Sequence, residues 1–305
     1  MSDVVVVDEL TPEAVRQAQA LIDEAARVDG QPAVSEQGRL QLRGGHRAGV
    51  RHLLLWQRGE LAGYGQLEDT DPVEAPTGEF VVHPDHRDQG HGLALGRALL
   101  EASGRRLRVW AHGGHPAARH LARLLGLTLF RELRQMRRPL TGLDLPEPSL
   151  PPGVRLRTFV PGRDDAAWLA ANAAAFAHHP EQGGMTQRDL DDRKAETWFD
   201  PKGFFLAVRD GGRDGEGEEL LGFHWTKVHS AEQLGEVYVV GVAPGAQGGG
   251  LGKALTLVGL RYLARDRGLP TAMLYVDADN TAAVKVYEGL GFETHEVDLM
   301  YRTEG

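Results

Sequence analysis

The segment EVYVVGVAPGAQGGGLGKAL, residues 236–255, decides the fold. It opens with β-branched and aromatic residues, turns through a glycine-rich stretch and continues into an apolar helical pattern. We therefore expect a strand over 234–242 and a helix over 251–267, ended by Gly268 and Pro270. Glycines at such a junction let free backbone N–H groups and the helix dipole hold an anion such as a phosphate.

Two common nucleotide motifs fail on this segment. A P-loop needs a glycine where Gln247 stands and a serine or threonine where Ala254 stands. A dinucleotide fingerprint needs its third glycine where Leu255 stands. The spacing that fits is Gln/Arg-x-x-Gly-x-Gly, from Gln247 to Gly252.

The layout occurs twice in the chain. EFVVHPDHRDQGHGLALG (79–96) aligns with VVGVAPGAQGGGLGKALT (239–256), and HPAARHLARLLGL (115–127) aligns with NTAAVKVYEGLGF (280–292). The proline-rich stretch TGLDLPEPSLPPG (141–153) lies between the copies and is typical of a semi-rigid spacer. We therefore predict a duplication, with domains 1–140 and 154–305 joined by a linker over 141–153.

Composition excludes several classes of function. The 305 residues include no cysteine, so disulfides, thiolate metal sites and a cysteine nucleophile are excluded. The net charge of -9 gives no general field for nucleic acid, and we expect no nucleic-acid partner. No apolar run is long enough for a membrane span and no secretory signal is visible, so we expect a cytoplasmic protein without membrane contact. The arginine-rich run over 131–140 reads as an edge strand with a solvated face.

The two glycine-rich motifs, each after a valine-rich strand and each followed by a helix ending in Leu-Gly, resemble the acyl-coenzyme A binding pattern of the GNAT superfamily of N-acetyltransferases. The resemblance implies an α/β fold of two tandem GNAT-like domains, each a mixed, mostly antiparallel twisted sheet flanked by helices. Within that superfamily, WAHGGHPAARHLARLLGL (110–127) and LYVDADNTAAVKVYEGLGF (274–292) resemble the tandem mycothiol synthase family. That family transfers acetyl from acetyl-CoA to the cysteinyl amine of cysteinyl-glucosaminyl-inositol, without a metal.

The resemblance also implies which residues contact acetyl-CoA. In each half they lie on the strand before the glycine-rich turn, in the turn itself and, in the second half, on the late helix. For the second half they are Val240, Gly241, Val242, Gln247, Gly248, Gly249, Gly250, Leu251, Gly252, Lys253, Asn280, Ala283 and Lys285. For the first half they are Phe80, Val81, Val82, Arg87, Asp88, Gln89, Gly90, His91, Gly92 and Leu93.

Two residues distinguish the halves. By resemblance Tyr287 protonates the departing thiolate, and its counterpart Ala122 has no proton to give. Glu236 opens the second-half strand as the base for the amine, directly or through water, and its counterpart is Pro76. We therefore predict a catalytic second half, and a first half that either binds acetyl-CoA structurally, without catalysis, or does not bind it at all.

The acceptor contacts implied by the resemblance are carboxylates, a lysine and a tyrosine, which suit a substrate with hydroxyls and a cationic amine. They are Glu36, Glu181, Lys227, Glu236 and Tyr275, with Glu36 reaching the acceptor from the first domain. We expect a monomer. Two other functions stay open on the sequence: a tandem acetyltransferase for another small amine or a peptide N-terminus, and a non-catalytic acetyl-CoA sensor.

Overall fold

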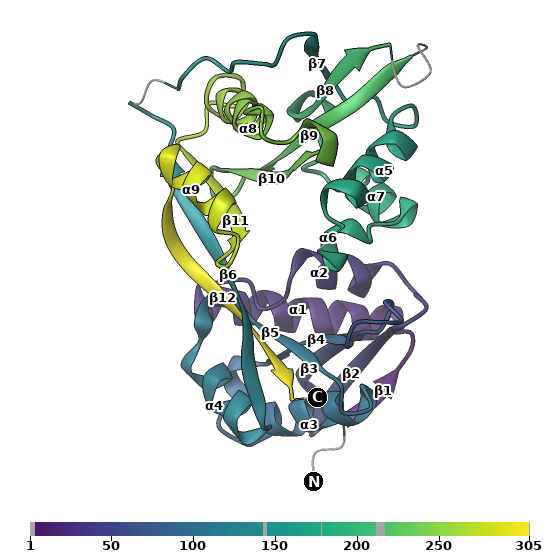
Figure 1. Ribbon diagram of the computed structural model, residues 1–305. Coiled ribbons are helices and arrows are strands. Elements are labelled where there is room, and N and C mark those ends of the chain that lie inside the picture. Colours follow the sequence, from purple (N-terminus) through teal and green to yellow (C-terminus); the bar gives the residue numbers. More distant parts are fainter. Residues whose placement is uncertain (1–3, 143–144, 178, 212–216, 305) are drawn as a thin grey trace. The chain divides into compact units, whose positions relative to one another are not determined.

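The computed structural model describes residues 4–142, 145–177, 179–211 and 217–304. Its contacts divide the chain into two compact units (Figure 1). The first unit comprises Met1–Arg134, Asp277–Asp279 and Glu296–Gly305, and the second comprises Gln135–Val276 and Asn280–His295. Both units combine a mixed sheet with helices, as the sequence predicts.

The first unit is a sheet with helices on both faces (Figure 1). Helices α1 (Pro12–Asp29) and α2 (Glu36–Arg43) pack on one face, and α3 (His91–Ala102) and α4 (Pro116–Leu124) pack on the other. Strands β1 to β4 pair antiparallel in sequence, and β4 and β5 pair parallel. In spatial order the strands are β1 (Val4–Val7), β2 (Val50–Gln57), β3 (Glu60–Glu68), β4 (Thr77–Val82), β5 (Arg108–Ala111) and parts of β12 (Glu293–Thr303) and β6 (Leu127–Pro139).

The second unit repeats this layout. Helices α5 (Asp165–Ala175), α6 (Pro180–Gly183) and α7 (Gln187–Lys194) follow its first strand, and α8 (Leu251–Arg261) and α9 (Thr281–Gly289) follow the later strands. An aromatic core that includes Trp168 and Trp225 fills the space between α5 and the sheet, and α8 and α9 pack on the opposite face. From one edge inward the strands are β7 (Val154–Thr158), β8 (Phe204–Asp210), β9 (Glu218–His229), β10 (Leu234–Val242) and β11 (Thr271–Asp277), followed by β6 and β12.

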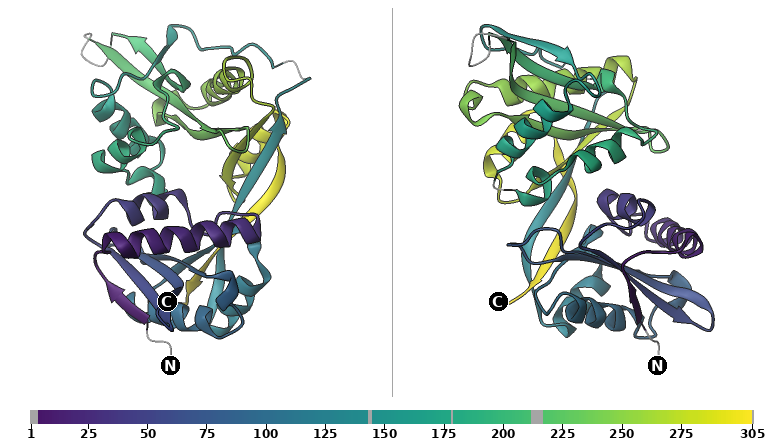
Figure 2. Two further views of the ribbon diagram at one scale, coloured as in Figure 1. Left: turned by 180° about the vertical axis from the view of Figure 1, so that it is seen from behind. Right: turned by 90° about the vertical axis from the view of Figure 1, so that its right-hand side faces the viewer.

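The last strand of the chain completes the first unit. Leu299–Arg302 of β12 pair antiparallel with Arg108–Ala111 of β5, and Figure 2 shows the yellow strand β12 reaching the C-terminus there. The contact-based division therefore differs from the boundaries predicted from the sequence, which assign residues 154–305 to one domain. The prediction of an edge strand for the run 131–140 is wrong: most of this run lies in β6, which is internal because β12 lies on one side of it and β11 on the other.

Local signals in the sequence account for most element ends. Thr11 caps α1 by accepting the Ala14 N–H at 3.2 Å, and Asn280 caps α9 by accepting the Ala283 N–H at 3.1 Å, as predicted. The strand predicted over 234–242 is confirmed. The helix predicted over 251–267 is α-helical only to Arg261 and continues as a π-helix over Tyr262–Asp266.

No helix in the described part of the chain is both long and apolar enough to cross a membrane.

Candidate active site

Strand β10 separates from its neighbour β11 partway along its length. The two strands pair in parallel from Leu234 to Val237, whereas β10 pairs with β9 as far as Val242. Beyond Val237 one edge of β10 therefore has no strand beside it. Ala243 donates its N–H to Leu221 of β9, so the alternation along the strand directs the Val240 and Val242 N–H groups to the open edge.

The first unit has the same separation. Strands β4 and β5 pair only at Thr77 and Gly78, while β4 pairs with β3 up to Val82. His83 donates its N–H to Ala62, so the same alternation directs the Phe80 and Val82 N–H groups to the open edge. In each unit the middle residue of the predicted triplet, Val81 or Gly241, has its N–H on the paired side.

The glycine-rich turn leads from the open edge of β10 into α8. Gly248 and Gly250 have φ of 82° and 80°, which favour glycine, and a Cβ at 248, 249 or 250 would meet nothing within 4 Å. Gly250 is the N-cap of α8, and no side chain caps that helix end. The first N–H groups of α8 thus have no side-chain cap and follow an open turn, which is the geometry of an anion site.

The turn in the first unit matches the second closely. Gly90 has φ 82° and ψ 2° at the N-cap of α3, against 80° and 0° for Gly250. Arg87 donates to the Val82 carbonyl and Gln247 donates to the Val242 carbonyl, at 3.4 and 3.3 Å. The predicted residues Asp88, Gln89, His91 and Leu93, and Lys253, lie in or next to these turns.

The two turns differ at their first side chain. Arg87 makes a two-point ion pair with Asp29 at the end of α1, with N–O distances of 2.7 and 2.9 Å. Gly92 also has a packing role, since a Cβ there would lie 2.9 Å from Leu121 of α4. The cation of the first-unit turn, Arg87, is thus already paired with a carboxylate of the same unit, Asp29.

A β-bulge aims the predicted base. The register between β9 and β10 shifts between Val237 and Val239, so Tyr238 is the extra residue. Without the shift, the alternation would place Glu236 on the face of Val240, toward α8. With it, Glu236 lies on the face of Val239, which packs in the aromatic core below α5. The Glu236 side chain is only 8% exposed, and its Oε2 lies 2.7 Å from His229 Nε2.

Lys227 lies directly across from Glu236 in the β9–β10 register. Its Nζ is 4.7 Å from the ring centre of Trp198 and 5.3 Å from that of Tyr238. The Tyr238 hydroxyl accepts a hydrogen bond from Arg193 Nε of α7 at 2.7 Å. These contacts gather a carboxylate, an ammonium, an imidazole and two aromatic rings on the face of the sheet that α5 and α7 cover.

Tyr287 lies on α9 and packs against the core cluster on the α8 face of the second-unit sheet. Its ring is half-buried and packs against Phe292, with ring centres 6.0 Å apart. Burial raises the pKa of Tyr287 to about 12. The phenol therefore keeps its proton at neutral pH and has that proton available to donate.

Comparison with known proteins identifies the family. The Acetyltransferase (GNAT) family profile matches residues 17–127 and 172–292. The mycothiol acetyltransferase of Streptomyces avermitilis is 75% identical over 97% of this chain and 93% of its own length. That of Streptomyces coelicolor is 74% identical over 97% and 94%. The chain belongs to the mycothiol acetyltransferases, a GNAT family. It is therefore an acyltransferase.

Solved structures show the same tandem fold. A tandem GNAT protein from the clavulanic acid biosynthesis pathway superposes with a TM-score of 0.73 at 17% identity, over 99% of this chain and 98% of its own. A GCN5-related N-acetyltransferase from Sphaerobacter thermophilus superposes with a TM-score of 0.67 at 23% identity, over 99% and 95%. At these identities the likeness concerns the fold alone.

The remaining predicted site residues of this acyltransferase lie on different elements: β11, α2, α6 and α9. Tyr275 on β11 is 37% exposed, and its hydroxyl accepts a hydrogen bond from Gln135 at 3.0 Å. Glu36 is the first residue of α2 in the first unit. Glu181 lies in α6, and its side chain is outside the described part of the structure. On α9, Ala283 is half-buried and Lys285 is exposed.

Sequence reasoning missed two members of the second-unit cluster. His229 is the nearest partner of Glu236, and Tyr238 is the bulge residue that turns Glu236. The signal for His229 was available, because a hairpin between 229 and 234 places it diagonal to Glu236. No pattern in the sequence marks the bulge. Within the described residues, no group of three His, Asp or Glu side chains could hold a metal ion.

Proposed function

We propose that the enzyme moves acetyl from acetyl-CoA to the cysteinyl amine of cysteinyl-glucosaminyl-inositol, and that the second unit performs the reaction. The observation that carries the proposal is the bulged strand β10. One strand presents the Val240 and Val242 N–H groups at an open edge, continues into an unblocked helix N-terminus, and turns Glu236 onto a polar cluster. The 75% identity to a mycothiol acetyltransferase supports the choice of acceptor.

The N–H groups at the open edge of β10 are suited to hold the pantetheine arm and the thioester carbonyl of acetyl-CoA. The turn over 247–253 then holds the pyrophosphate on backbone N–H groups. This explains how a chain of net charge -9 binds a polyanion. The donors are fixed before the reaction, so they stabilise the developing oxyanion without reorganising.

The proton transfers follow from Glu236 and Tyr287. As the amine nitrogen attacks the thioester carbon, Glu236 takes a proton from nitrogen, directly or through water. The carbon–sulfur bond breaks, and the Tyr287 hydroxyl gives its proton to the departing sulfur. Lys227, Tyr275, Glu181 and Glu36 are proposed to hold the acceptor. In the first unit the corresponding positions are Pro76 and Ala122, so we propose that it binds acetyl-CoA without turning it over.

The test is acetyl transfer followed by mass spectrometry across a panel of amines that includes the cysteinyl-glucosaminyl-inositol compound. We expect turnover of that compound. If only a different amine or a peptide is acetylated, the proposed acceptor is wrong. Tyr287→Phe should lower kcat by about 100-fold and leave both KM values nearly unchanged. Release of CoA without formation of an acetylated amine, or no release of CoA at all, would contradict the proposal that the enzyme acetylates this cysteinyl amine.

Since burial raises the pKa of Tyr287 to about 12, the acid form persists throughout the assay range. The kcat profile should therefore show no loss from Tyr287 ionisation up to pH 10. A decline with a pKa near 9 that disappears in Tyr287→Phe would contradict this environment for the hydroxyl.

A further inference from the structure

The first unit contains a buried charged triad that the reaction does not use. His112 follows β5, and its Nδ1 lies 3.2 Å from Asp298 Oδ2 on β12. Its Nε2 lies 3.5 Å from Glu79 Oε1 on β4. The three side chains are 15%, 12% and 10% exposed. An imidazole between two carboxylates is costly to bury, so the arrangement calls for a reason.

Charge state follows from these surroundings. Burial alone would lower the pKa of His112, but the hydrogen bond with Asp298 and the charges of both carboxylates raise it to about 10. Burial alone would raise the pKa of Glu79, but His112 and the Ser35 N–H lower it below its ordinary value. At neutral pH His112 is therefore a cation and Glu79 an anion.

Glu79 also holds the start of α2. Its Oε2 accepts the Ser35 N–H at 2.9 Å, and Ser35 is the N-cap of α2. The Ser35 Oγ in turn accepts the Gly38 N–H at 3.0 Å. In a capping box the N3 side chain accepts the N-cap N–H, but here N3 is Gly38, which has no side chain. A Cβ at Gly38 would lie 2.9 Å from Glu79 Oε2. Glu79 thus takes the place of the missing N3 carboxylate from 44 residues away.

When the cap of a helix comes from the helix's own residues, the cap does not fix the start of the helix relative to the sheet. α7 shows the local version, with Thr186 and Asp189 capping each other. The start of α2 is instead tied to β4 through Glu79. His112 and Asp298 extend the tie to β5 and β12. Asp298 is itself fixed by the Gly113 N–H at 2.7 Å. The first residue after this cap is Glu36.

We propose that the Glu79–His112–Asp298 triad positions Glu36 for the acceptor by fixing the N-terminus of α2. Glu79 is a positioning residue in this scheme and touches no substrate. The proposal rests on the acceptor role proposed for Glu36. It explains why Gly38 stands at N3 of α2 and why the cationic His112 is buried next to Glu79.

The test uses Glu79→Ala and a rescue. Glu79→Ala should raise the acceptor KM about tenfold, with the KM for acetyl-CoA changing less than about twofold. The added change Gly38→Glu supplies a local capping-box carboxylate in the space that Glu79→Ala vacates. It should recover most of the acceptor affinity. Glu74→Gln is the matched control, since it breaks a first-unit ion pair with Arg108 at 3.0 Å and should leave both KM values unchanged.

Two further measurements separate positioning from damage. In a Glu36→Gln background, Glu79→Ala should change the acceptor KM by less than about twofold, because the two changes remove one interaction. Amide hydrogen exchange over 35–40 should speed up in Glu79→Ala and slow again with Gly38→Glu. Glu79→Met, whose side chain has no oxygen to accept the Ser35 N–H, serves if Glu79→Ala does not fold.

The outcomes decide the proposal. An unchanged acceptor KM in a folded Glu79 variant, unchanged exchange in α2, or a full additional effect in the Glu36→Gln background would overturn it. A Glu36→Gln variant with wild-type acceptor KM would overturn it together with the acceptor role of Glu36. Failure of the proposed function is seen separately, as a wild-type enzyme that does not acetylate the cysteinyl compound.

Discussion

The buried carboxylate of Glu236 contacts a more exposed side chain, the imidazole of His229. Glu236 is 8% exposed, whereas His229, whose Nε2 is 2.7 Å away, is 25% exposed. Glu236, the proposed base, must pass on the proton that it receives before the next turnover. The contact therefore predicts that His229 carries this proton outward.

His229→Gln should keep a hydrogen bond to Glu236 but block transfer through the ring. We expect kcat to fall about tenfold or more, with the acceptor KM changed much less. Initial rates measured over both substrates would show this. Ser230→Ala, at the exposed next position, is the control. A kcat in His229→Gln equal to that of the control would mean that the proton leaves by another path.

Arg87 illustrates a residue whose type was predictable and whose partner was not. The motif marks it as an anion contact, but it is already paired with Asp29. A pyrophosphate must displace Asp29 to reach the guanidinium. Nothing in the sequence links positions 29 and 87, because the pair depends on where α1 ends over the sheet.

Asp29→Asn should therefore tighten acetyl-CoA binding by the first unit several-fold and leave kcat unchanged. Isothermal calorimetry measures the affinity of each site. Only the first-unit affinity should change, since the uncharged Gln247 stands at the position of Arg87 in the second unit. Asp23→Asn, which breaks an α1 ion pair with Arg39, is the matched control. Equal affinities in Asp29→Asn and wild type would show that the pair does not compete with the ligand.

At the scale of elements, the strands and helices of the second half follow the sequence patterns closely. Strand-forming residue types suffice for β10 and β11, and Asn280 marks the α9 cap. The bulge at Tyr238 cannot be predicted in this way, because a bulge needs no particular residue type. It nevertheless moves the side chains of all earlier residues of β10 to the opposite face of the sheet. The resemblance singles out Glu236 as the expected base, but no sequence pattern predicts the face of the sheet that it occupies.

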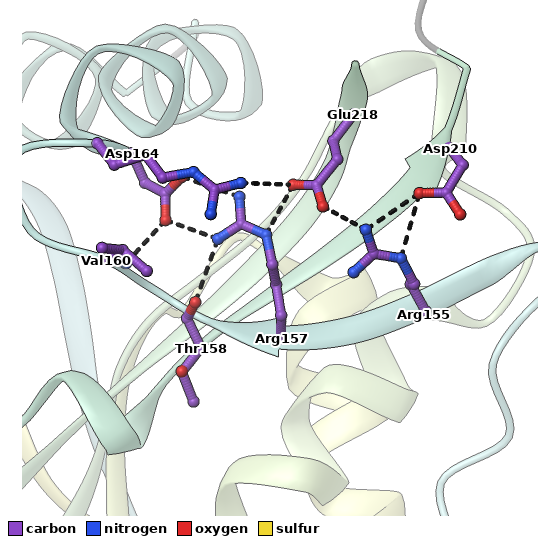
Figure 3. Close-up of polar contacts among 8 residues, drawn as sticks. Arg155, Arg157, Thr158, Val160, Asp164, Asp210 and Glu218 are labelled. Carbon is purple, nitrogen blue, oxygen red and sulfur yellow. Dashed lines mark hydrogen bonds and ion pairs between the residues drawn. The ribbon is translucent and has the colours of Figure 1, made fainter. Parts of the chain in front are cut away.

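Strand β7 is held at the edge of the second-unit sheet by an ion network (Figure 3). Arg157 pairs with Asp164 at the start of α5 through two bonds of 2.6 and 2.8 Å, and with Glu218 of β9 at 2.7 Å. The pKa of Asp164 is below its ordinary value: burial acts to raise it, but the Arg157 bonds and the Val160 N–H lower it. Arg155, two residues earlier, pairs with Asp210 in a more exposed position.

Arg157→Gln should lower the free energy of unfolding by about 1 to 2 kcal/mol, because it leaves the enclosed Asp164 carboxylate with only the exposed Arg163, 3.8 Å away, as a cation. Arg155→Gln should cost clearly less, since solvent screens its pairs. Urea unfolding of both variants compares the two. Because the folded pKa of Asp164 is lowered, its contribution is present above about pH 4 and is lost as the pH falls further. The difference between Arg157→Gln and wild type should therefore shrink in acid, and equal losses at both positions would refute the argument.

At the scale of the molecule, duplication was readable from the sequence and the path of the chain was not. Two copies of one pattern predict two sheets, each closed by its own last strand. The structure instead places Leu299 and Tyr301, from the end of the second copy, in the core of the first unit. Local patterning specifies that 293–303 is a strand but not which strands it pairs with, because that depends on contacts between residues far apart in the sequence, such as Leu299 with Ala111.

The crossing of β12 predicts that a change near the C-terminus destabilises the N-terminal unit. Leu299 is 5% exposed and packs in the core that also holds Leu53 and Leu107. Leu299→Ala should cost about 2 to 5 kcal/mol there. Hydrogen exchange should therefore quicken in β2 and β3, while β8 and β9 keep their protection. Leu257→Ala, buried in the second-unit core, should give the reverse pattern. Faster exchange in β8 and β9 alone on changing Leu299 would show that the last strand stabilises its own copy instead.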